Sequence, residues 1–509
     1  MNVGAAAYWI GIDLGTSSCK VVAITASGEV AASRSAEYPL ITPRAGWAEQ
    51  EPDAWWQATD VTVRGVMSEL PKAASIRGIG LCGQMHGLTP MDGMGNVIRP
   101  AILWNDQRAA PQCEEITRRA GGEAALLRLV QNRMLPGFTG GKILWLRQHE
   151  PDNYNRLRHV LNPKDFLRLR MTGEYVTDVS DASGTGLFDV RHRQWSTTLL
   201  KMLEIPLDYM PRVVESSEVS GVLLDDVAHR WGMPVGTRVV GGGGDSVLQT
   251  TSMGIVEPGR LGVTIGTAGI VAGATNFCPD NPGGRLQISC GNAPGRWHVM
   301  GVSLTSGGAF QWLRNALAPI ADMRGLSYER LVEVAREAPP GSGGLLFMPY
   351  LLGERCPHEA PDARGGWIGL NALHSVHHLS RSVVEGVLLS LREIVDLCAD
   401  AGLEWDEIRA SGGATAERFW TQTLADVLQQ DIVLVTGASQ GGAFGAALLA
   451  AVGTGNWRSL DDASSVIQET DRISPNPDLA ALYEQLHQVH SRLLQTLMPS
   501  FLKIAAGPL

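Results

Sequence analysis

The chain has 509 residues, 44% hydrophobic and 18% charged, which is enough apolar material for two buried cores and gives no sign of disorder. Its formal net charge is -10, no segment gathers lysines and arginines, and no apolar window is long enough to cross a bilayer, so neither a nucleic acid nor a membrane is an expected partner. The seven cysteines lie far apart without a C-x-x-C pair, which is typical of a reduced protein and predicts a cytoplasmic location.

The first predicted element is a hairpin whose turn is rich in glycine and hydroxyl groups. Apolar residues at 10–14 lead into the turn Gly15-Thr16-Ser17, and a second strand leaves it at 20–24. Glycine allows a phosphate to approach the backbone closely, and the threonine hydroxyl adds a hydrogen-bond donor. Asp13 lies at the end of the first strand, where we expect it near the metal ion of a nucleotide.

Two further apolar strands end in polar residues. The run at 76–82 predicts a buried strand that ends in Gly83-Gln84-Met85-His86-Gly87, and the run at 101–104 ends in Asn105-Asp106-Gln107-Arg108. Proteins of the α/β class place ligand sites at such strand ends. Asp106 and Arg108 are expected to form a structural ion pair instead of contacting a substrate.

Four consecutive glycines mark the end of the next strand. The strand at 238–240 runs into Gly241 to Gly244, followed by Asp245. Because glycine is entropically unfavourable inside a regular element, this run indicates a close approach by another backbone or by a ligand. We expect Asp245 at the mouth of that turn. A domain boundary is placed after Glu257, which gives domains at 1–257 and 258–509.

The second half repeats the glycine-threonine turn. Gly266 and Thr267 form its centre, but Thr264 stands where the first copy has Asp13. Two such hairpins facing each other would hold a nucleotide polyphosphate between two lobes. The remaining predicted elements are helices at 379–401, 417–428 and 442–452 and strands at 408–410 and 432–435.

Five segments, in this order and spacing, resemble the FGGY carbohydrate kinases. They are Ile10 to Ser17, Gly83 to Gly87, Gly243 to Asp245, Gly266-Thr267, and Ser411-Gly412-Gly413-Ala414. Pro163-Lys164-Asp165 and Gly353-Glu354-Arg355 are among the further stretches that carry the resemblance, which covers nearly the whole chain. It implies an α/β fold of two ribonuclease-H-like domains, of the actin, hexokinase and chaperone-ATPase superfamily. Each domain is expected to have a mixed five-stranded sheet flanked by helices, with the active site in the cleft between them.

The resemblance also implies roles for individual residues. Asp245 would be the catalytic base that accepts the proton of the attacking sugar hydroxyl, and Asp13 would act beside it and bind Mg²⁺. The implied sugar-binding residues are Met85, His86, Asp245, Asn105 and, as in some members only, Arg133. The implied ATP-binding residues are Thr16, Ser17, Lys20, Gly266, Thr267, Gly412, Gly413 and Ala414.

The chemistry of phosphoryl transfer is consistent with these roles. The transition state spreads charge over phosphate oxygens, so the protein needs aligned donors and a metal ion more than covalent machinery. A carboxylate such as Asp245 is the simplest acceptor for the hydroxyl proton. Each assignment also has a structural alternative: Asp13 or Asp245 as a turn residue, His86 as a structural histidine, and Met85 as core filler.

We therefore expect an ATP-dependent, Mg²⁺-requiring kinase that phosphorylates a ketopentose, D-xylulose at O5, in pentose catabolism. Ser246 stands where an asparagine often follows the catalytic aspartate, and Thr415-Ala416 replaces an arginine-containing segment, so the acceptor is less defined than the reaction. Ribulose, another ketose, a sugar alcohol and glycerol remain alternative acceptors. A sugar or nucleotide sensor and an ATPase of the chaperone or actin type are alternatives of another class, and a homodimer is left open.

Overall fold

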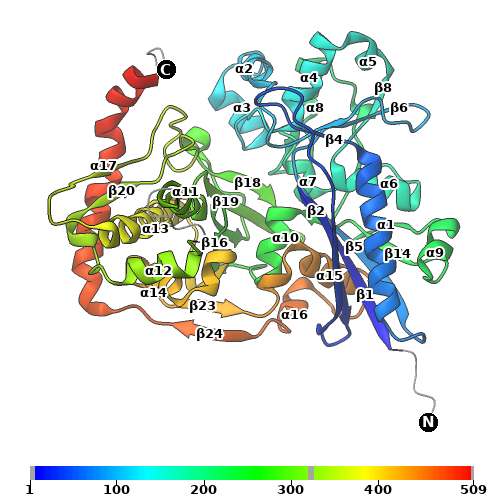
Figure 1. Ribbon diagram of the computed structural model, residues 1–509. Coiled ribbons are helices and arrows are strands. Elements are labelled where there is room, and N and C mark those ends of the chain that lie inside the picture. The colour runs from blue at the N-terminus through cyan, green and yellow to red at the C-terminus, as the bar shows by residue number, and fades with distance from the viewer. Residues whose placement is uncertain (1–5, 319–325, 506–509) are drawn as a thin grey trace.

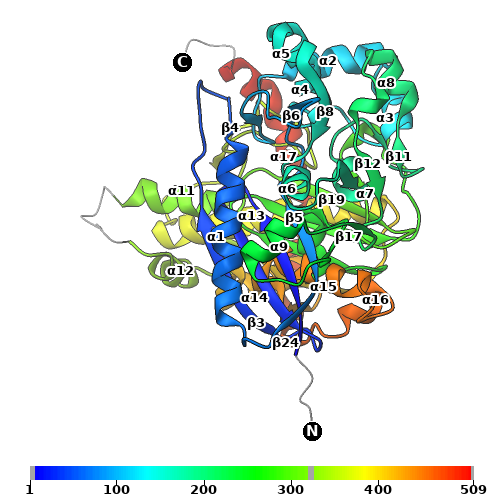
Figure 2. The same cartoon turned by 90° about the vertical axis from the view of Figure 1, so that its right-hand side faces the viewer.

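A computed structural model describes residues 6–318 and 326–505 and shows two mixed β-sheets with helices on their faces (Figures 1 and 2). The first sheet belongs to the N-terminal half of the chain and the second to the C-terminal half. In these two described ranges, none of the helices combines the length and the apolar character that a membrane span requires.

The first sheet has five main strands in the order β3-β2-β1-β5-β14. Strand β1 pairs antiparallel with β2 and parallel with β5, and β5 pairs parallel with β14. Two short strands extend this core, with β13 at the edge beside β14 and β15 beside β5. The bounds are β1 (Ala7–Leu14), β2 (Ser18–Thr25), β3 (Val30–Glu37), β5 (Ser75–Gly83), β13 (Val219–Val222), β14 (Arg238–Val240) and β15 (Gly243–Gly244).

The second sheet repeats the same order and directions, as β19-β17-β16-β22-β23, with β18 and β24 at its two edges. The predicted fold class is confirmed, but each sheet contains seven strands and not five, because short strands add to the repeated core. The bounds are β16 (Gly259–Ile265), β17 (Gly269–Thr275), β18 (Gln287–Cys290), β19 (Trp297–Ser303), β22 (Trp405–Ser411), β23 (Ile432–Val435) and β24 (Glu469–Ile473).

The two glycine-threonine turns join equivalent strands but differ in length. Four residues, 15–18, separate the paired residues Leu14 and Cys19 in the first hairpin. Three residues, 266–268, separate Ile265 and Gly269 in the second. The repeat seen in the sequence therefore reflects a repeated sheet, while the second turn is one residue tighter.

Helices cover the sheets, and the small strands lie in connecting segments. The helices are α1 (Pro52–Glu69), α2 (Ala110–Arg119), α3 (Glu123–Val130), α4 (Thr139–His149), α5 (Pro151–Arg156), α6 (Pro163–Thr172), α7 (Val179–Ser183), α8 (Thr197–Leu203), α9 (Asp225–Trp231), α10 (Asp245–Ser252), α11 (Gly307–Leu317), α12 (Tyr328–Arg336), α13 (Val376–Asp400), α14 (Arg418–Leu428), α15 (Gly442–Gly453), α16 (Leu460–Ser464) and α17 (Ala480–Ala505). The small strands are β4 (Glu49–Gln50), β6 (Thr89–Asp92), β7 (Ala101–Ile102), β8 (Leu157–Leu161), β9 (Val176–Asp178), β10 (Phe188–Asp189), β11 (Gln194–Trp195), β12 (Arg212–Val214), β20 (Leu346–Met348) and β21 (Gly366–Ile368).

Helix α15 joins the two halves of the molecule. It follows β23 of the second sheet but packs directly on β1 and β5 of the first, and it lies with α10 at the centre of Figure 1. The contact depends on glycines in the strands, since a Cβ atom on Gly80 would lie 1.9 Å from the carbonyl oxygen of Ala446. A Cβ on Gly11 would lie 1.8 Å from the carbonyl oxygen of Ala443. These positions admit only glycine without displacement of the helix.

Candidate active site

The two predicted catalytic aspartates lie at the ends of strands that flank β5: Asp13 is near the end of β1, and Asp245 directly follows β15. Asp13 on β1 pairs with Cys82 of β5, and Gly243 on β15 pairs with the same residue from the opposite side. Two strand spacings place Asp13 and Gly243 roughly 10 Å apart across the sheet. Asp245 begins helix α10 two residues after Gly243. The sheet therefore brings both carboxylates to the C-terminal ends of its parallel strands.

The surroundings of the two carboxylates disfavour their ionised forms. Burial raises the pKa of Asp13 above its usual value. Burial, followed by the charge of Asp13, raises the pKa of Asp245 from 3.8 to about 7. Oδ1 of Asp13 is buried without a hydrogen-bond partner among the described residues, while Oδ1 of Asp245 accepts from the Ser246 amide at 2.7 Å. Such a pair is suited to receive a cation or a proton.

Helix α4 and the loop after α7 hold His86 in a defined orientation. His86 has a positive φ of 69°, and its carbonyl oxygen accepts from Lys142 Nζ at 2.7 Å and from Thr139 Oγ1 at 3.2 Å. Nδ1 of His86 lies 2.6 Å from the carbonyl oxygen of Gly184, and the ring stacks on Phe138.

This contact also defines the tautomer of His86. Burial, assisted by the charges of Arg355 and Lys142, lowers the pKa of His86 to about 3, so the ring is neutral at neutral pH. Because a carbonyl oxygen only accepts hydrogen bonds, the ring proton is on Nδ1 and Nε2 is an acceptor. The geometry suits a hydroxyl donor on the Nε2 side.

Met85 connects the His86 segment with the start of α10. A Cβ atom on Gly244 would lie 2.5 Å from the sulfur of Met85, so the Met85 side chain lies directly against the residue that precedes Asp245. Ser246 Oγ approaches the same sulfur at 3.2 Å. The structure thus brings Met85 and His86 together with Asp245, which is distant from them in the sequence.

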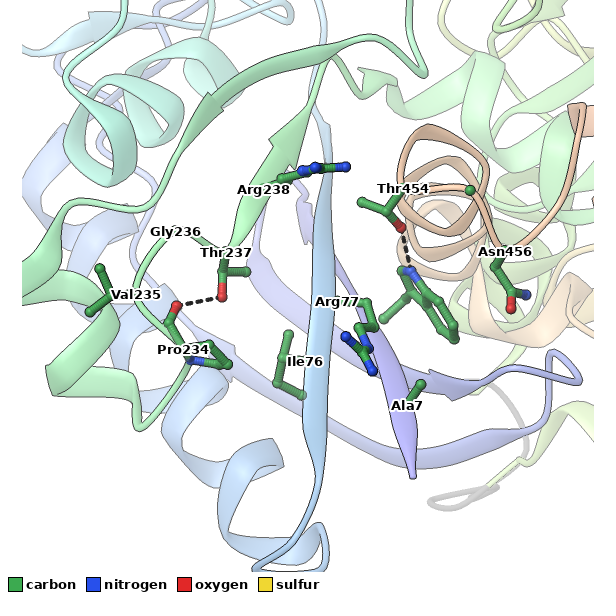
Figure 3. Close-up of a pocket in the computed structure, with 12 residues that line it drawn as sticks. Ala7, Ile76, Arg77, Pro234, Val235, Gly236, Thr237, Arg238, Thr454 and Asn456 are labelled. Carbon is green, nitrogen blue, oxygen red and sulfur yellow. Dashed lines mark hydrogen bonds between the residues drawn. The ribbon is translucent and has the colours of Figure 1, made fainter. Parts of the chain in front are cut away.

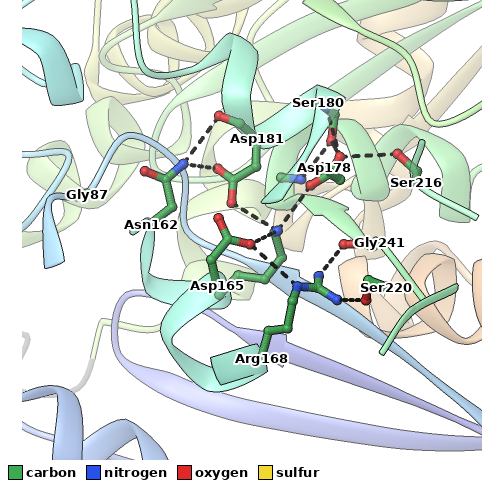
Figure 4. Close-up of polar contacts among 12 residues, drawn as sticks. Gly87, Asn162, Asp165, Arg168, Asp178, Ser180, Asp181, Ser216, Ser220 and Gly241 are labelled. Carbon is green, nitrogen blue, oxygen red and sulfur yellow. Dashed lines mark hydrogen bonds and ion pairs between the residues drawn. The ribbon is translucent and has the colours of Figure 1, made fainter. Parts of the chain in front are cut away.

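A buried charged cluster supports the glycine turn that carries Asp245 (Figure 4). Lys164 Nζ pairs with Asp165 at 2.5 Å, with Asp178 at 3.0 Å and with Asp181 at 3.4 Å. Asp178 accepts from the amide of Ser180 at 2.8 Å, and Ser180 Oγ in turn accepts from the Gly244 amide at 3.1 Å. The cluster is therefore connected by hydrogen bonds to the residue before Asp245.

Arg168 supports the same turn from another side (Figure 4). Its fully buried guanidinium donates to the carbonyl oxygens of Val240, at 2.8 Å, and Gly241, and to Ser220 Oγ. These carbonyls lie at the beginning of the glycine run. The turn that looks flexible in the sequence is therefore held by buried charged donors.

The predicted nucleotide-binding residues lie at or near the ends of the equivalent strands of both sheets. Thr16 Oγ1 accepts from the Trp104 indole at 2.8 Å, and Lys20 Nζ donates to the Ser439 carbonyl oxygen, at 3.3 Å, from the first half to the second. Gly412 has a φ of 98° and packs on the end of β16. The predicted residues that are exposed are Ser17, Thr267, Gly412 and Gly413, and those that are partly buried are Thr16, Lys20, Gly266 and Ala414.

The two less secure sugar contacts are placed differently. Oδ1 of Asn105 is buried without a hydrogen-bond partner in the described part of the chain, and its contact with a sugar stays a prediction. Arg133, in contrast, forms ion pairs with Glu123 at 2.8 Å and with Glu359 of the second half. Its guanidinium is already engaged, and its contact with a sugar stays a prediction.

The sequence did not indicate several residues that the structure places around this site. Lys142, Asp178, Asp181 and Gly184 were not selected, and Lys164 was noted only as part of a stretch of resemblance. The expected ion pair of Asp106 and Arg108 is confirmed at 2.7 Å. The sequence carries no local signal for the burial of Lys142 and Lys164, because burial of a lysine becomes visible only when the helices are packed.

A hollow of about 490 Å³ lies elsewhere, beside the beginning of β1 (Figure 3). It is lined by residues such as Ala7, Arg77, Arg238 and Thr454, and none of the predicted catalytic residues is among them. It lies at the opposite end of β1 from Asp13 and is separate from the candidate site.

The residues present fit a divalent cation of the magnesium type. Oδ1 of Asp13 is buried and has no hydrogen-bond partner among the described residues. The charge of Asp13 also acts on the carboxylate of Asp245. The described residues contain no group of three or more His, Cys, Asp or Glu side chains arranged around one metal position. Mg²⁺ is usually held by one or two carboxylates together with water and substrate phosphates, and the buried Oδ1 of Asp13 fits that requirement.

Comparison with known proteins identifies relatives over nearly the full length. Residues 8–252 and 261–454 match the N-terminal and C-terminal domains of the FGGY family of carbohydrate kinases. The xylulose kinase of Escherichia coli K12 is 36% identical, covering 96% of this chain and 99% of its own. The gluconokinase of Bacillus subtilis is 29% identical, with 98% of both chains covered. The crystal structure of a xylulose kinase from Brucella ovis superimposes with a TM-score of 0.90 at 32% identity, covering 96% of this chain and 99% of its own.

Proposed function

Because the chain belongs to the FGGY family of carbohydrate kinases, we propose that it transfers the γ-phosphate of ATP to O5 of D-xylulose. The observation that carries the proposal is the juxtaposition of Met85, His86 and Asp245 beside Asp13, in a chain 36% identical to a xylulose kinase. The similarity to a gluconokinase makes D-gluconate the most relevant competing acceptor.

The proposed reaction assigns a task to each of these side chains. The sugar lies against Met85 and donates a hydroxyl hydrogen bond to Nε2 of His86. Asp245 accepts the proton of the attacking hydroxyl as the new phosphate ester bond forms. A carboxylate with a pKa of about 7 is a better base than an ordinary aspartate, because its affinity for the proton is greater.

The proposed nucleotide site combines backbone and side-chain donors. Thr16, Ser17 and Lys20 of the first hairpin, and Gly266 and Thr267 of the second, hold phosphate oxygens. Gly412, Gly413 and Ala414 lie beside the adenosine, where glycine allows close approach. Asp13 would hold Mg²⁺, which supplies positive charge to phosphate oxygens when it is bound.

A panel of acceptors tests the proposal. Purified protein with ATP and Mg²⁺ is given D-xylulose, D-ribulose, D-gluconate, a pentitol or glycerol, and ADP formation is followed. D-Xylulose should give the highest kcat/KM. Turnover with D-gluconate or a polyol, while all ketopentoses fail, would show that the acceptor is wrong although the kinase reaction is right. A cytoplasmic location and a homodimer remain predictions.

A further inference from the structure

The loop at 353–360 of the second half lies beside both the phosphate turn and the first half. Glu354 accepts from Ser303 Oγ at 2.8 Å and from the Leu304 amide at 3.1 Å. Ser303 pairs with Gly269, the residue that follows the turn of Gly266 and Thr267. Farther along the loop, Glu359 forms the ion pair with Arg133 of the first half. The loop is thus held at both ends, by one half of the molecule and by the other.

Arg355, between these two anchors, carries a cationic side chain that has no carboxylate counter-ion in the described part of the chain. Gln287 on β18 lies against its guanidinium, and with the Gln287 amide turned so that its oxygen faces Arg355, that oxygen accepts from the guanidinium, with Nε at 3.2 Å. Within the described ranges no carboxylate lies at ion-pair distance from it, because the Glu354 carboxylate faces Ser303, Leu304 and the main-chain amide of Arg355. Guanidinium groups that are shielded from solvent are normally paired, and this half-buried one has five donors of which Gln287 satisfies only a part.

The buried arginines Arg108, Arg168 and Arg381 have partners that account for their positions. Arg108 pairs with Asp106 and Glu49, and Arg381 pairs with Glu385. Arg168 donates to main-chain carbonyls of the glycine turn. Arg355 differs from these because, among the described residues, neither a carboxylate nor a main-chain carbonyl pairs with its guanidinium.

Arg355 is linked to the proposed acceptor site through Gln287 and strand β18. Strand β18, which carries Gln287, docks against α7 through a hydrogen bond of 3.0 Å from the Cys290 amide to Ser183 Oγ. The next residue, Gly184, accepts the hydrogen bond of the His86 ring. The charge of Arg355 also acts on His86. A cation of the second half and an acceptor nitrogen of the first half therefore border the same region.

We propose that Arg355 binds the acceptor sugar by donating hydrogen bonds to its oxygen atoms from the second half of the molecule. The sugar would then be held by Met85 and His86 on one side and by Arg355 on the other. Acceptor binding would favour the arrangement in which the two halves are close. The inference rests on the proposed function in that a sugar occupies the space beside His86, but it does not depend on which sugar this is.

Kinetics of Arg355→Ala and Arg355→Lys test this inference, with Arg364→Ala as the matched control. Arg364 is nine residues downstream in the same connecting segment, and among the described residues it donates only to the main-chain carbonyls of Pro361 and Ala363. Arg355→Ala should raise the KM of the acceptor about 10-fold or more, and millimolar guanidinium ion should restore part of the loss. The KM of ATP should stay within about 2-fold, and Arg364→Ala should behave as the wild type.

Arg355→Lys keeps the charge but not the planar set of donors. It protects the test against a folding failure of the alanine variant, and it should leave a measurable increase in the acceptor KM at an unchanged unfolding temperature. An acceptor KM equal to that of the wild type in both variants would overturn the inference. If the wild-type protein does not phosphorylate D-xylulose, the proposed substrate is wrong, but the role of Arg355 is still testable. The KM values of the variants are then measured with the acceptor that the wild type does phosphorylate.

Discussion

Asp245→Asn should stabilise the protein while it abolishes phosphoryl transfer. Burial and the charge of Asp13 raise the pKa of Asp245 from 3.8 to about 7, so the ionised form is unfavourable in the folded state. Between these two pH values the folded chain binds more protons than the unfolded chain, and stability falls as pH rises through this window. The shift corresponds to about 4 kcal/mol at about 1.4 kcal/mol per pKa unit. Because Asp245 is partly exposed, solvent screening reduces the expected gain at pH 8 to about 1–3 kcal/mol.

Urea unfolding in EDTA, at pH 4.0 and at pH 8.0, measures this effect. Without a divalent cation, Asp245→Asn should be more stable than the wild type at pH 8.0, and the difference should be small at pH 4.0. Asp406→Asn is the matched control, since Asp406 is an exposed carboxylate on β22. Equal stabilities of wild type and Asp245→Asn at pH 8.0 would refute the reasoning, because they would show that the carboxylate is not disfavoured in its charged form.

Three further predictions concern packing and buried charge. Gly80→Ala should lower the free energy of unfolding in denaturant by about 3 kcal/mol, because its Cβ would meet a carbonyl of α15. Gly65→Ala, at a position in α1 where the added Cβ would make only ordinary van der Waals contacts, should not destabilise the protein. Lys164→Met should lose about 3–5 kcal/mol, since it leaves buried carboxylates unpaired, and should lower kcat in the protein that remains folded; an unchanged kcat would separate the cluster from the placement of Asp245. Burial opposes ionisation of Glu393, but hydrogen bonds from two histidines outweigh it and lower its pKa to about 2. Its contribution to stability is present above about pH 4.3 and is lost as pH falls toward 2, so acid unfolding monitored by circular dichroism should be less steep in Glu393→Gln.

The repeated turns and their strands could be predicted because their signals are local. Alternating apolar residues and a glycine turn define a hairpin wherever it occurs, and the strand at 432–435 was placed with its observed bounds. The difference in length between the two turns has no such signal, because it depends on which residues pair across the hairpin. The edge strands that bring each sheet to seven are short, and their pairing depends on the neighbouring strand.

The support of the site was less predictable than the site itself. Asp13, Met85, His86 and Asp245 were selected from strand ends and from the family resemblance. Lys142 looks in the sequence like an ordinary solvent-exposed helix residue, yet it is fully buried and bonded to the His86 carbonyl. Burial of charge is a property of tertiary packing, and only the assembled fold reveals it.

The alternatives of another class can now be assessed. Membership of a carbohydrate kinase family shows that the interpretation as a chaperone-type ATPase is wrong. The two paired hairpins that suggested this alternative are present, but they do not distinguish the two classes of protein. The choice of acceptor is still a matter for experiment, because relatives named for xylulose and for gluconate share the same fold.

Transfer to D-xylulose by the wild type and by Asp245→Ala is the most direct measurement of the central claim. ADP formation and the phosphorus NMR spectrum of the product report transfer, and titration calorimetry reports sugar binding. We predict D-xylulose 5-phosphate from the wild type, and sugar binding within a few-fold but a loss of kcat of about 10³-fold or more from the variant. Near-normal turnover by Asp245→Ala would contradict the assignment of Asp245 as the base on which this account depends.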